Sequence, residues 1–307
     1  MTIQQLRYVI KITECGSITE AARQLFVSQP SLSAAVKELE AELGIEIFRR
    51  TAKGITLTAD GTEFLSYVRQ IIEQTELLEE RYQHKKPSKQ LCRISTQHYA
   101  FAVNAFVAMI SSLDTDEYEL TLRETRTYEI IEDVASFRSE LGILYLSNFN
   151  EKVLRNMFKE KSLTFTPLFE AKPHVFISST HPLAGREEID ISELDDYPCL
   201  VFEQGTYNSF YFFEEILSTE PHKKRILVSD RATLFNLLIG LNGYTTCTGV
   251  LNRNLNGDNI VAVRLRTDEN MLVGYITSER QSPGACATRF LEELKRLIAA
   301  DGFEVLS

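Results

Sequence analysis

The chain of 307 residues has no tryptophan and only five cysteines, and it lacks an apolar run near the ~18 residues that a membrane helix needs. Its N-terminal residues also lack the basic-then-apolar order of a secretory signal. The cysteines are odd in number and form no CxxC pair, which leaves no motif for zinc or for a redox couple. We therefore expect a cytoplasmic protein with reduced, structural thiols, including Cys199 and Cys247.

A surplus of basic residues is also missing, because 33 Lys and Arg face 43 Asp and Glu, for a net charge of -10. DNA affinity depends on cations that neutralise phosphates, so this total argues against nucleic acid. The excess of acidic residues is uneven along the chain, however. Residues 1–90 hold 12 basic and 12 acidic side chains, whereas residues 91–307 hold 21 basic and 31 acidic ones. The neutral first part therefore remains compatible with DNA binding.

Motifs of common enzymes are absent as well. The chain has no GxSxG, HExxH, GxxxxGK[ST] or GxGxxG sequence. Its histidines lie at isolated positions, without metal-ligand spacing: His84, His98, His174, His181 and His222. We expect no enzymatic activity, no metal and no cofactor.

Three regions differ in pattern. Residues 1–58 show short helical patterns, and residues 59–86 show one long amphipathic pattern that ends before Pro87 and Ser88, a typical domain boundary. From residue 91 on, strand-like runs near 91–95, 118–124, 141–146, 174–179, 198–203, 225–229 and 244–248 alternate with helical patterns near 101–111, 128–138, 150–160, 208–218, 231–241 and 286–299. This alternation predicts an α/β region with a mostly parallel sheet, large enough for two lobes.

The first region has two consecutive helix starts. Ser17 and Glu20 have the spacing of a capping box, and Ser28 is a second cap, with Pro30 in the first turn that follows. In the second helix, Leu32, Val36, Leu39 and Leu43 form one apolar stripe, and Gln29, Pro30, Ser31, Ser33 and Lys37 lie on other faces. Small polar residues at an exposed helix N-terminus are typical of a helix-turn-helix that reads the major groove.

The run 45–57 follows this helix and reads as a β-wing. Arg49, Arg50 and Lys53 surround Gly54, which suits contacts with phosphates or the minor groove. The same spacing also fits a small helical domain with well-capped helices and a solvated polar face. Spacing alone leaves both interpretations open.

The residues of the first region resemble the DNA-binding domain of LysR-type transcriptional regulators. The resemblance is carried, without gaps, by Gly16-Ser17-Ile18-Thr19-Glu20-Ala21-Ala22, Val27-Ser28-Gln29-Pro30-Ser31-Leu32-Ser33, Phe48-Arg49-Arg50 and Leu57-Thr58-Ala59-Asp60-Gly61. It implies that Gln29, Pro30 and Ser33 approach bases, while Ser31, Lys37, Arg49, Arg50 and Lys53 hold the DNA backbone.

The resemblance extends more weakly through the chain and implies a domain plan. A winged helix-turn-helix is expected at 1–58, a dimerisation helix at 59–88, and a two-lobed sensor like a periplasmic binding protein at 89–307. Lobe 1 would take about 91–164 and 269–307, and lobe 2 about 165–268. Such regulators bind double-stranded DNA operators and a small-molecule effector, and they form dimers and usually tetramers.

The long helix has the seam of a coiled coil. Phe64, Val68, Ile71, Thr75, Leu78 and Tyr82 recur at 4-3-4-3-4 spacing with charged residues around them. We interpret this seam as the dimer contact, with packing inside one chain as the alternative.

In the sensor, polar residues gather where strands give way to helices. They are Ser95, Thr96, Gln97 and His98; Thr125, Arg126 and Thr127; Gly205, Thr206 and Asn208; and Thr246. Helix N-termini with hydroxyl groups bind small anions or zwitterions, although each residue also suits an ordinary helix cap. Arg126 can pair with a ligand carboxylate, or equally with Glu124 or Glu129.

Four stretches are similar to Gram-positive regulators of methionine uptake and surface-polysaccharide genes. They are Arg123-Glu124-Thr125-Arg126-Thr127, Gly205-Thr206-Tyr207-Asn208-Ser209-Phe210-Tyr211, Val228-Ser229-Asp230-Arg231-Ala232-Thr233-Leu234-Phe235-Asn236 and Leu255-Asn256-Gly257-Asp258-Asn259. This similarity implies a sulfur-containing amino acid or its precursor as effector. The alternative is a cytoplasmic solute-binding protein without a regulatory role, because that fold is shared; the capped N-terminal helices argue against it.

Overall fold

The computed structural model describes residues 1–51, 54–83, 90–114, 117–251 and 257–306. The chain divides into two compact units, Met1–Ser88 and Lys89–Ser307. No helix in the described ranges is long and apolar enough to cross a membrane.

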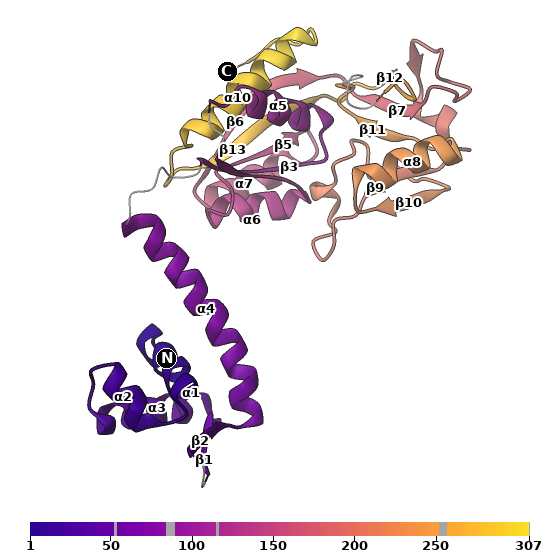
Figure 1. Ribbon diagram of the computed structural model, residues 1–307. Helices are drawn as coiled ribbons and strands as arrows, with labels where there is room; N and C mark the ends of the chain where they lie inside the picture. Colours follow the sequence, from indigo (N-terminus) through magenta and orange to yellow (C-terminus); the bar gives the residue numbers. More distant parts are fainter. Residues whose placement is uncertain (52–53, 84–89, 115–116, 252–256, 307) are drawn as a thin grey trace. The chain divides into compact units, whose positions relative to one another are not determined.

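The first unit is a winged helix-turn-helix followed by a long helix (Figure 1). Its elements are α1 (Ile3–Cys15), α2 (Ile18–Gln24), α3 (Gln29–Leu43), β1 (Phe48–Thr51), β2 (Gly54–Leu57) and α4 (Ala59–Gln83). Strands β1 and β2 pair antiparallel and form the predicted wing. Of the predicted stripe of α3, Leu32, Val36 and Leu39 are buried in the core, whereas Leu43 at the end of the helix is 37% exposed.

The two predicted caps differ in detail. Ser28 Oγ accepts a hydrogen bond from the Ser31 N–H at 3.2 Å, as expected. Ser17 Oγ accepts from the Glu20 N–H at 3.4 Å, but the carboxylate of Glu20 accepts from Arg23 Nε at 2.9 Å instead of returning to the cap. The predicted capping box is therefore half formed, because an (i, i+3) ion pair takes its acidic member.

The second unit starts with lobe 1, whose sheet has the strand order β4-β3-β5-β13-β6. The strands are β3 (Gln90–Thr96), β4 (Tyr118–Glu124), β5 (Leu141–Leu146), β6 (Leu163–Ala171) and β13 (Met271–Ser278). Helices α5 (Ala100–Ser111) and α10 (Ala285–Ala300) cover one face, and α6 (Thr127–Ala135) and α7 (Glu151–Glu160) cover the other (Figure 1). Each face has its own apolar core.

Lobe 2 contains a four-stranded sheet, β11-β7-β12-β8, and a parallel pair, β9 and β10. Its elements are β7 (His174–Ser178), β8 (Glu188–Ile189), η1 (Ile191–Leu194), β9 (Cys199–Phe202), η2 (Phe210–Phe212), β10 (Arg225–Val228), α8 (Arg231–Leu241), β11 (Thr245–Cys247) and β12 (Ile260–Leu265). Lobe 2 has two apolar clusters, and helix α8 packs on its strands to form one of them, through Leu234 and Leu238.

The structure corrects three expectations. The sheets are mixed rather than mostly parallel, because β13 runs antiparallel to both β5 and β6. Strand β6 belongs to the sheet of lobe 1, so lobe 2 begins after Ala171 and not near 165. The helix predicted at 208–218 is only a 3-10 turn at Phe210–Phe212, since the backbone turns extended at Phe213 and carries Glu214 and Glu215 into the interior.

Candidate functional site

The N-terminus of α3 presents the predicted base-reading residues to solvent. Gln29, Pro30 and Ser31 are exposed, and Ser33 is half-buried beside them. Ser31 Oγ lies 2.7 Å from Ser28 Oγ, so this hydroxyl is partly engaged by the cap. Lys37 is exposed further along the same helix. The start of α3 therefore exposes small polar side chains, which can form hydrogen bonds with base edges.

The wing is anchored to the helices by the backbone. The Ile55 N–H donates to the Gly16 carbonyl at 3.1 Å. A Cβ on Gly54 would lie 2.9 Å from that same oxygen, and Gly54 has φ +119°, so this position requires glycine. Arg49 is exposed on β1. The side chain of Arg50 and the whole of Lys53 lie outside the described part of the chain.

The seam of α4 divides into two parts. Val68 is fully buried against Leu6 of α1, and Phe64 is half-buried in the same cluster. These two seam residues therefore pack inside their own unit, which was the alternative interpretation. Ile71, Leu78 and Tyr82 are 39%, 58% and 73% exposed and remain available to a partner.

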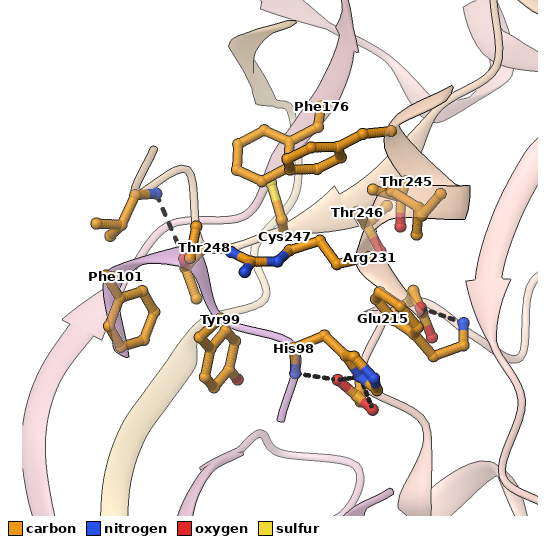
Figure 2. A pocket seen from close by; sticks show the side chains of 16 residues that line it. His98, Tyr99, Phe101, Phe176, Glu215, Arg231, Thr245, Thr246, Cys247 and Thr248 are labelled. Atoms are coloured by element: carbon orange, nitrogen blue, oxygen red, sulfur yellow. Dashed lines mark hydrogen bonds and ion pairs between the residues drawn. The ribbon is translucent and has the colours of Figure 1, made fainter. Parts of the chain in front are cut away.

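A small cavity lies between the two lobes, with a volume of about 40 Å³. Figure 2 shows its side chains. They come from the start of α5, from β7, β9, α8 and β11, and from the segment after η2: His98, Tyr99, Ala100, Phe101, Phe176, Phe202, Glu214, Glu215, Arg231, Leu234, Phe235, Thr245, Thr246, Cys247, Thr248 and Val250. A water molecule needs roughly 10–15 Å³ on this scale, so the cavity accepts only a few heavy atoms unless the lobes move apart.

Of the predicted effector residues, His98 and Thr246 line this cavity. Thr246 Oγ1 donates to the Ile216 carbonyl at 2.9 Å. Thr96 is fully buried nearby in sequence, and its Oγ1 has no hydrogen-bond partner among the described residues. Gly205, Thr206 and Asn208 are exposed on the loop after β9.

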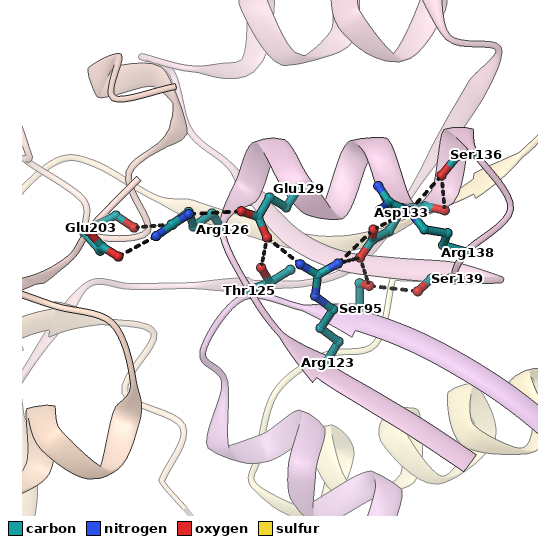
Figure 3. Close-up of polar contacts among 10 residues, drawn as sticks. All are labelled: Ser95, Arg123, Thr125, Arg126, Glu129, Asp133, Ser136, Arg138, Ser139 and Glu203. Atoms are coloured by element: carbon teal, nitrogen blue, oxygen red, sulfur yellow. Dashed lines mark hydrogen bonds and ion pairs between the residues drawn. The ribbon is translucent and has the colours of Figure 1, made fainter. Parts of the chain in front are cut away.

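Other predicted effector residues are engaged by the protein itself. Ser95 Oγ donates to Asp133 at 2.8 Å, inside a polar network with Arg123 (Figure 3). Gln97 Nε2 donates to Thr127 Oγ1 at 2.6 Å, and both side chains are buried. Thr125 Oγ1 donates to Glu129. These side chains fix the junctions of lobe 1 in position.

Arg126 connects the two lobes. Its guanidinium pairs with Glu129 at 3.1 Å, one of the expected partners, and with the carboxylate of Glu203 from lobe 2 (Figure 3). Its Nε also donates to the Glu203 carbonyl at 3.2 Å. A Cβ on Gly205 would lie 2.7 Å from Arg126 Nη1, so glycine there leaves room for this link.

A second interlobe link is buried. His98 Nδ1 of lobe 1 lies 2.9 Å from Glu214 Oε1 of lobe 2, and the His98 N–H donates to Glu214 Oε2 at 2.8 Å. The imidazole also stacks on Phe202, with ring centroids 3.8 Å apart. Burial lowers the pKa of His98, but the Glu214 carboxylate outweighs burial, and the net pKa is raised. The cation at His98 is thus favoured by its partner.

A third link joins Arg231 Nε of α8 to Glu124 Oε1 of β4 at 3.4 Å. Sequence reasoning missed Arg231, Glu214 and Glu215 as site residues. Arg231 directly follows Asp230, the N-cap of α8, and a cation in a first helical turn was a usable signal because the helix dipole disfavours it there. The two glutamates carried no such signal, since they fell inside a run that reads as helix.

A winged helix-turn-helix and a two-lobed α/β unit with a cavity between its lobes define a DNA-binding regulator with a ligand sensor. Residues 3–62 match the family model for the "Bacterial regulatory helix-turn-helix protein, lysR family", and residues 113–299 match the model for the "LysR substrate binding domain". The chain therefore belongs to the LysR family of DNA-binding transcriptional regulators, which combine this DNA-binding domain with an effector-binding domain.

Individual relatives agree with this family. The uncharacterized HTH-type transcriptional regulator YvbU of Bacillus subtilis is 28% identical over 214 residues, covering 68% of this chain and 69% of the relative. The OxyR C206 mutant of Corynebacterium glutamicum has a TM-score of 0.54 at 18% identity, covering 97% and 94% of the two chains. Full-length CbnR, solved with its target DNA, has a TM-score of 0.53 at 19% identity, covering 96% and 99%. These structures show that the fold is shared.

Proposed function

We propose that this regulator reads operator DNA with the start of α3 and changes its DNA affinity when a small effector binds between the lobes of its sensor. The reading residues are Gln29, Pro30 and Ser33, and the backbone contacts are Ser31, Lys37, Arg49, Arg50 and Lys53. Two copies would associate through the exposed part of the α4 seam, Ile71, Leu78 and Tyr82.

The observation that carries the DNA-reading part is the exposed polar start of α3. Gln29 and Ser31 lie in the first turn of a helix that packs into the core through Leu32, Val36 and Leu39, so the core fixes the helix while these side chains face solvent. A bidentate side-chain contact to a base contributes about 1–3 kcal/mol of discrimination. A neutral DNA-binding unit needs such specific contacts more than a strongly basic one does.

The test is a pair of binding curves for the full chain. The first uses an operator selected in vitro from random duplexes, and the second uses a scrambled duplex at the same salt concentration. Gln29→Ala should lose about 1–3 kcal/mol on the operator and little on the scrambled DNA. An equal loss on both sequences would remove Gln29 from base reading.

The proposal that an effector binds between the lobes is supported by buried polar atoms that lack hydrogen-bond partners among the described residues. Thr96 Oγ1 of lobe 1 and Gln204 Oε1 of lobe 2 are buried without a hydrogen-bond partner among the described residues. Each lies within two positions of a residue that contacts the other lobe, His98 and Glu203 respectively. A buried polar group without a partner costs about 1–3 kcal/mol, so a bound molecule that satisfies these atoms would be favoured there.

We further propose that the effector is a sulfur-containing amino acid or its precursor. The support is the similarity of the 123–127 and 205–211 stretches to regulators of methionine uptake, together with aromatic walls that suit a thioether: Phe101, Phe176, Phe202 and Phe235. Titration of the full chain with L-methionine, L-homocysteine and O-acetyl-L-serine tests this identity. If none of these binds while another small molecule does, the effector is not a sulfur-containing amino acid or its precursor, but the proposal that an effector binds between the lobes is retained.

A further inference from the structure

Among the described charged residues that line the cavity or link the two lobes, one carboxyl group has no ion pair. The cations Arg126, Arg231 and His98 each contact a carboxylate, as described above. Two acids line the cavity, Glu214 and Glu215. Glu214 is the partner of His98, whereas Glu215 forms no ion pair within the described ranges of the chain.

Glu215 is also only half satisfied by hydrogen bonds. Glu215 is only 4% exposed. One oxygen, Oε1, accepts from the Phe202 N–H at 2.7 Å, which fixes the carboxyl group against the end of β9. The other, Oε2, is buried without a partner among the described residues. When this carboxyl group is ionised, a residue that lines the cavity therefore carries an acceptor oxygen that the fold leaves unused.

The surroundings keep this carboxyl group neutral when the cavity holds no cation. Burial, followed by the nearby charge of Glu214, raises the pKa of Glu215 to about 8. The titratable and charged groups that act on Glu215 or are acted on by it are Glu214, Arg225 of β10, Tyr99, Tyr145 of β5 and Cys199 of β9. Arg225 favours the charged form but does not overcome burial.

We propose that Glu215 is the recognition site for a primary ammonium group, so that the effector of this sensor is a small amine, amino acids included. The inference rests on the proposed effector function and specifies the ligand. A primary ammonium group has three N–H donors and one positive charge, which matches a carboxylate with an unused oxygen. The apolar part of the molecule would lie against Phe176 and Phe235.

A metal ion fits the site less well. No group of three or more His, Cys, Asp and Glu side chains in the described part of the chain is arranged to hold one. A metal would also need several oxygen ligands at once, whereas a single ammonium is served by one carboxylate and the threonine hydroxyls on β11. The ammonium group therefore accounts for the site with fewer ligands.

Binding would release a proton. Below its raised pKa, Glu215 carries a proton in the free protein; the incoming R–NH3+ stabilises the carboxylate, and the carboxyl proton leaves to the buffer. At pH 7 the calorimetric binding enthalpy should therefore differ between phosphate and Tris, in proportion to the ionisation enthalpies of the buffers. A net release of protons is expected when the amine binds.

The experiment compares two probes of the same shape, n-butylamine and n-butanol, by calorimetry on the full chain. The wild type should prefer the amine by about tenfold or more. Glu215→Gln keeps an acceptor for the Phe202 N–H and removes the charge; it should lose both the preference and the proton release. Glu215→Asp keeps the charge and should retain part of the preference, which secures the test if the Gln variant does not fold.

Glu269→Gln is the matched control. Glu269 has an equally unpartnered buried oxygen, and it lines a neighbouring hollow with Glu215 but not the interlobe cavity. Its replacement should leave the preference for the amine unchanged. Equal loss in both variants, or equal affinity of the wild type for the two probes, overturns the role of Glu215 while the cavity remains a binding site. If neither these probes nor L-methionine binds, effector binding itself fails and the ammonium site with it.

Discussion

The buried link between His98 and Glu214 should contribute more stability than the exposed link between Arg126 and Glu203. The side chains of the first pair are 6% and 5% exposed, and those of the second are 32% and 40% exposed. A hydrogen bond to a buried charged group contributes about 1.5–3 kcal/mol, whereas an exposed ion pair contributes about 0.2–1 kcal/mol. Solvent screening thus gives these two contacts different contributions to stability.

Glu214→Gln removes the charge and keeps the shape of the side chain. For a unit the size of the sensor, each kcal/mol lowers the melting temperature by roughly 2–4 °C, so we expect a decrease of about 3–12 °C in the sensor transition. Glu203→Gln is the matched control and should lower it by at most about 4 °C. Scanning calorimetry of the full chain measures both.

The pH dependence gives the direction of the effect. Because the pKa of His98 is raised in the folded protein, its stabilising contribution is complete below its ordinary pKa of 6.5 and is lost as the pH rises through the raised value. The difference between wild type and Glu214→Gln should therefore be largest below pH 6.5 and shrink as the pH rises through the raised pKa of His98. Equal decreases for both variants, or a larger difference at pH 8 than at pH 6, would refute the reasoning.

Three further changes test other contacts. Arg49→Ala should reduce the slope of log K against log salt by about one in DNA titrations; an unchanged slope would place Arg49 away from the phosphates. Ile71→Asp should raise the dimer dissociation constant by at least about tenfold in sedimentation, since a charge would enter an apolar contact. Gly205→Val should cost about 1–3 kcal/mol in denaturant unfolding, because φ is +60° and its Cβ would lie 2.7 Å from Arg126; Gly185→Ala, with open space around it, should not.

The DNA-binding unit was predictable because its signals are local. The caps at Ser17 and Ser28 and the spacing of the apolar stripe on α3 each depend on neighbours within a few positions. The division of the α4 seam was not predictable, because it depends on the packing of Val68 against Leu6 of α1, which is distant in sequence. A heptad pattern does not distinguish a partner helix from α1 of the same chain.

The sensor site was predictable only in outline. The junctions after β3 and β4 were placed correctly, but the hydroxyl and amide groups there look the same in sequence whether they bind a ligand or hold the fold. Ser95 is engaged by Asp133 and Gln97 by Thr127, contacts that span at least 30 residues. The glutamates after η2 turn inward because His98 and Phe202 offer them backbone N–H groups, which helix propensity does not reveal.

The position of β13 has a consequence for synthesis. This strand lies between β5 and β6, yet it comes about a hundred residues after β6 in the chain, at Met271–Ser278. Lobe 2 is continuous and the DNA-binding unit comes first, so both are complete on the ribosome before lobe 1 can close its sheet. A nascent chain therefore has a complete DNA-binding domain before its effector-binding domain can fold. A truncated product would keep the DNA-binding domain without the sensor that regulates it.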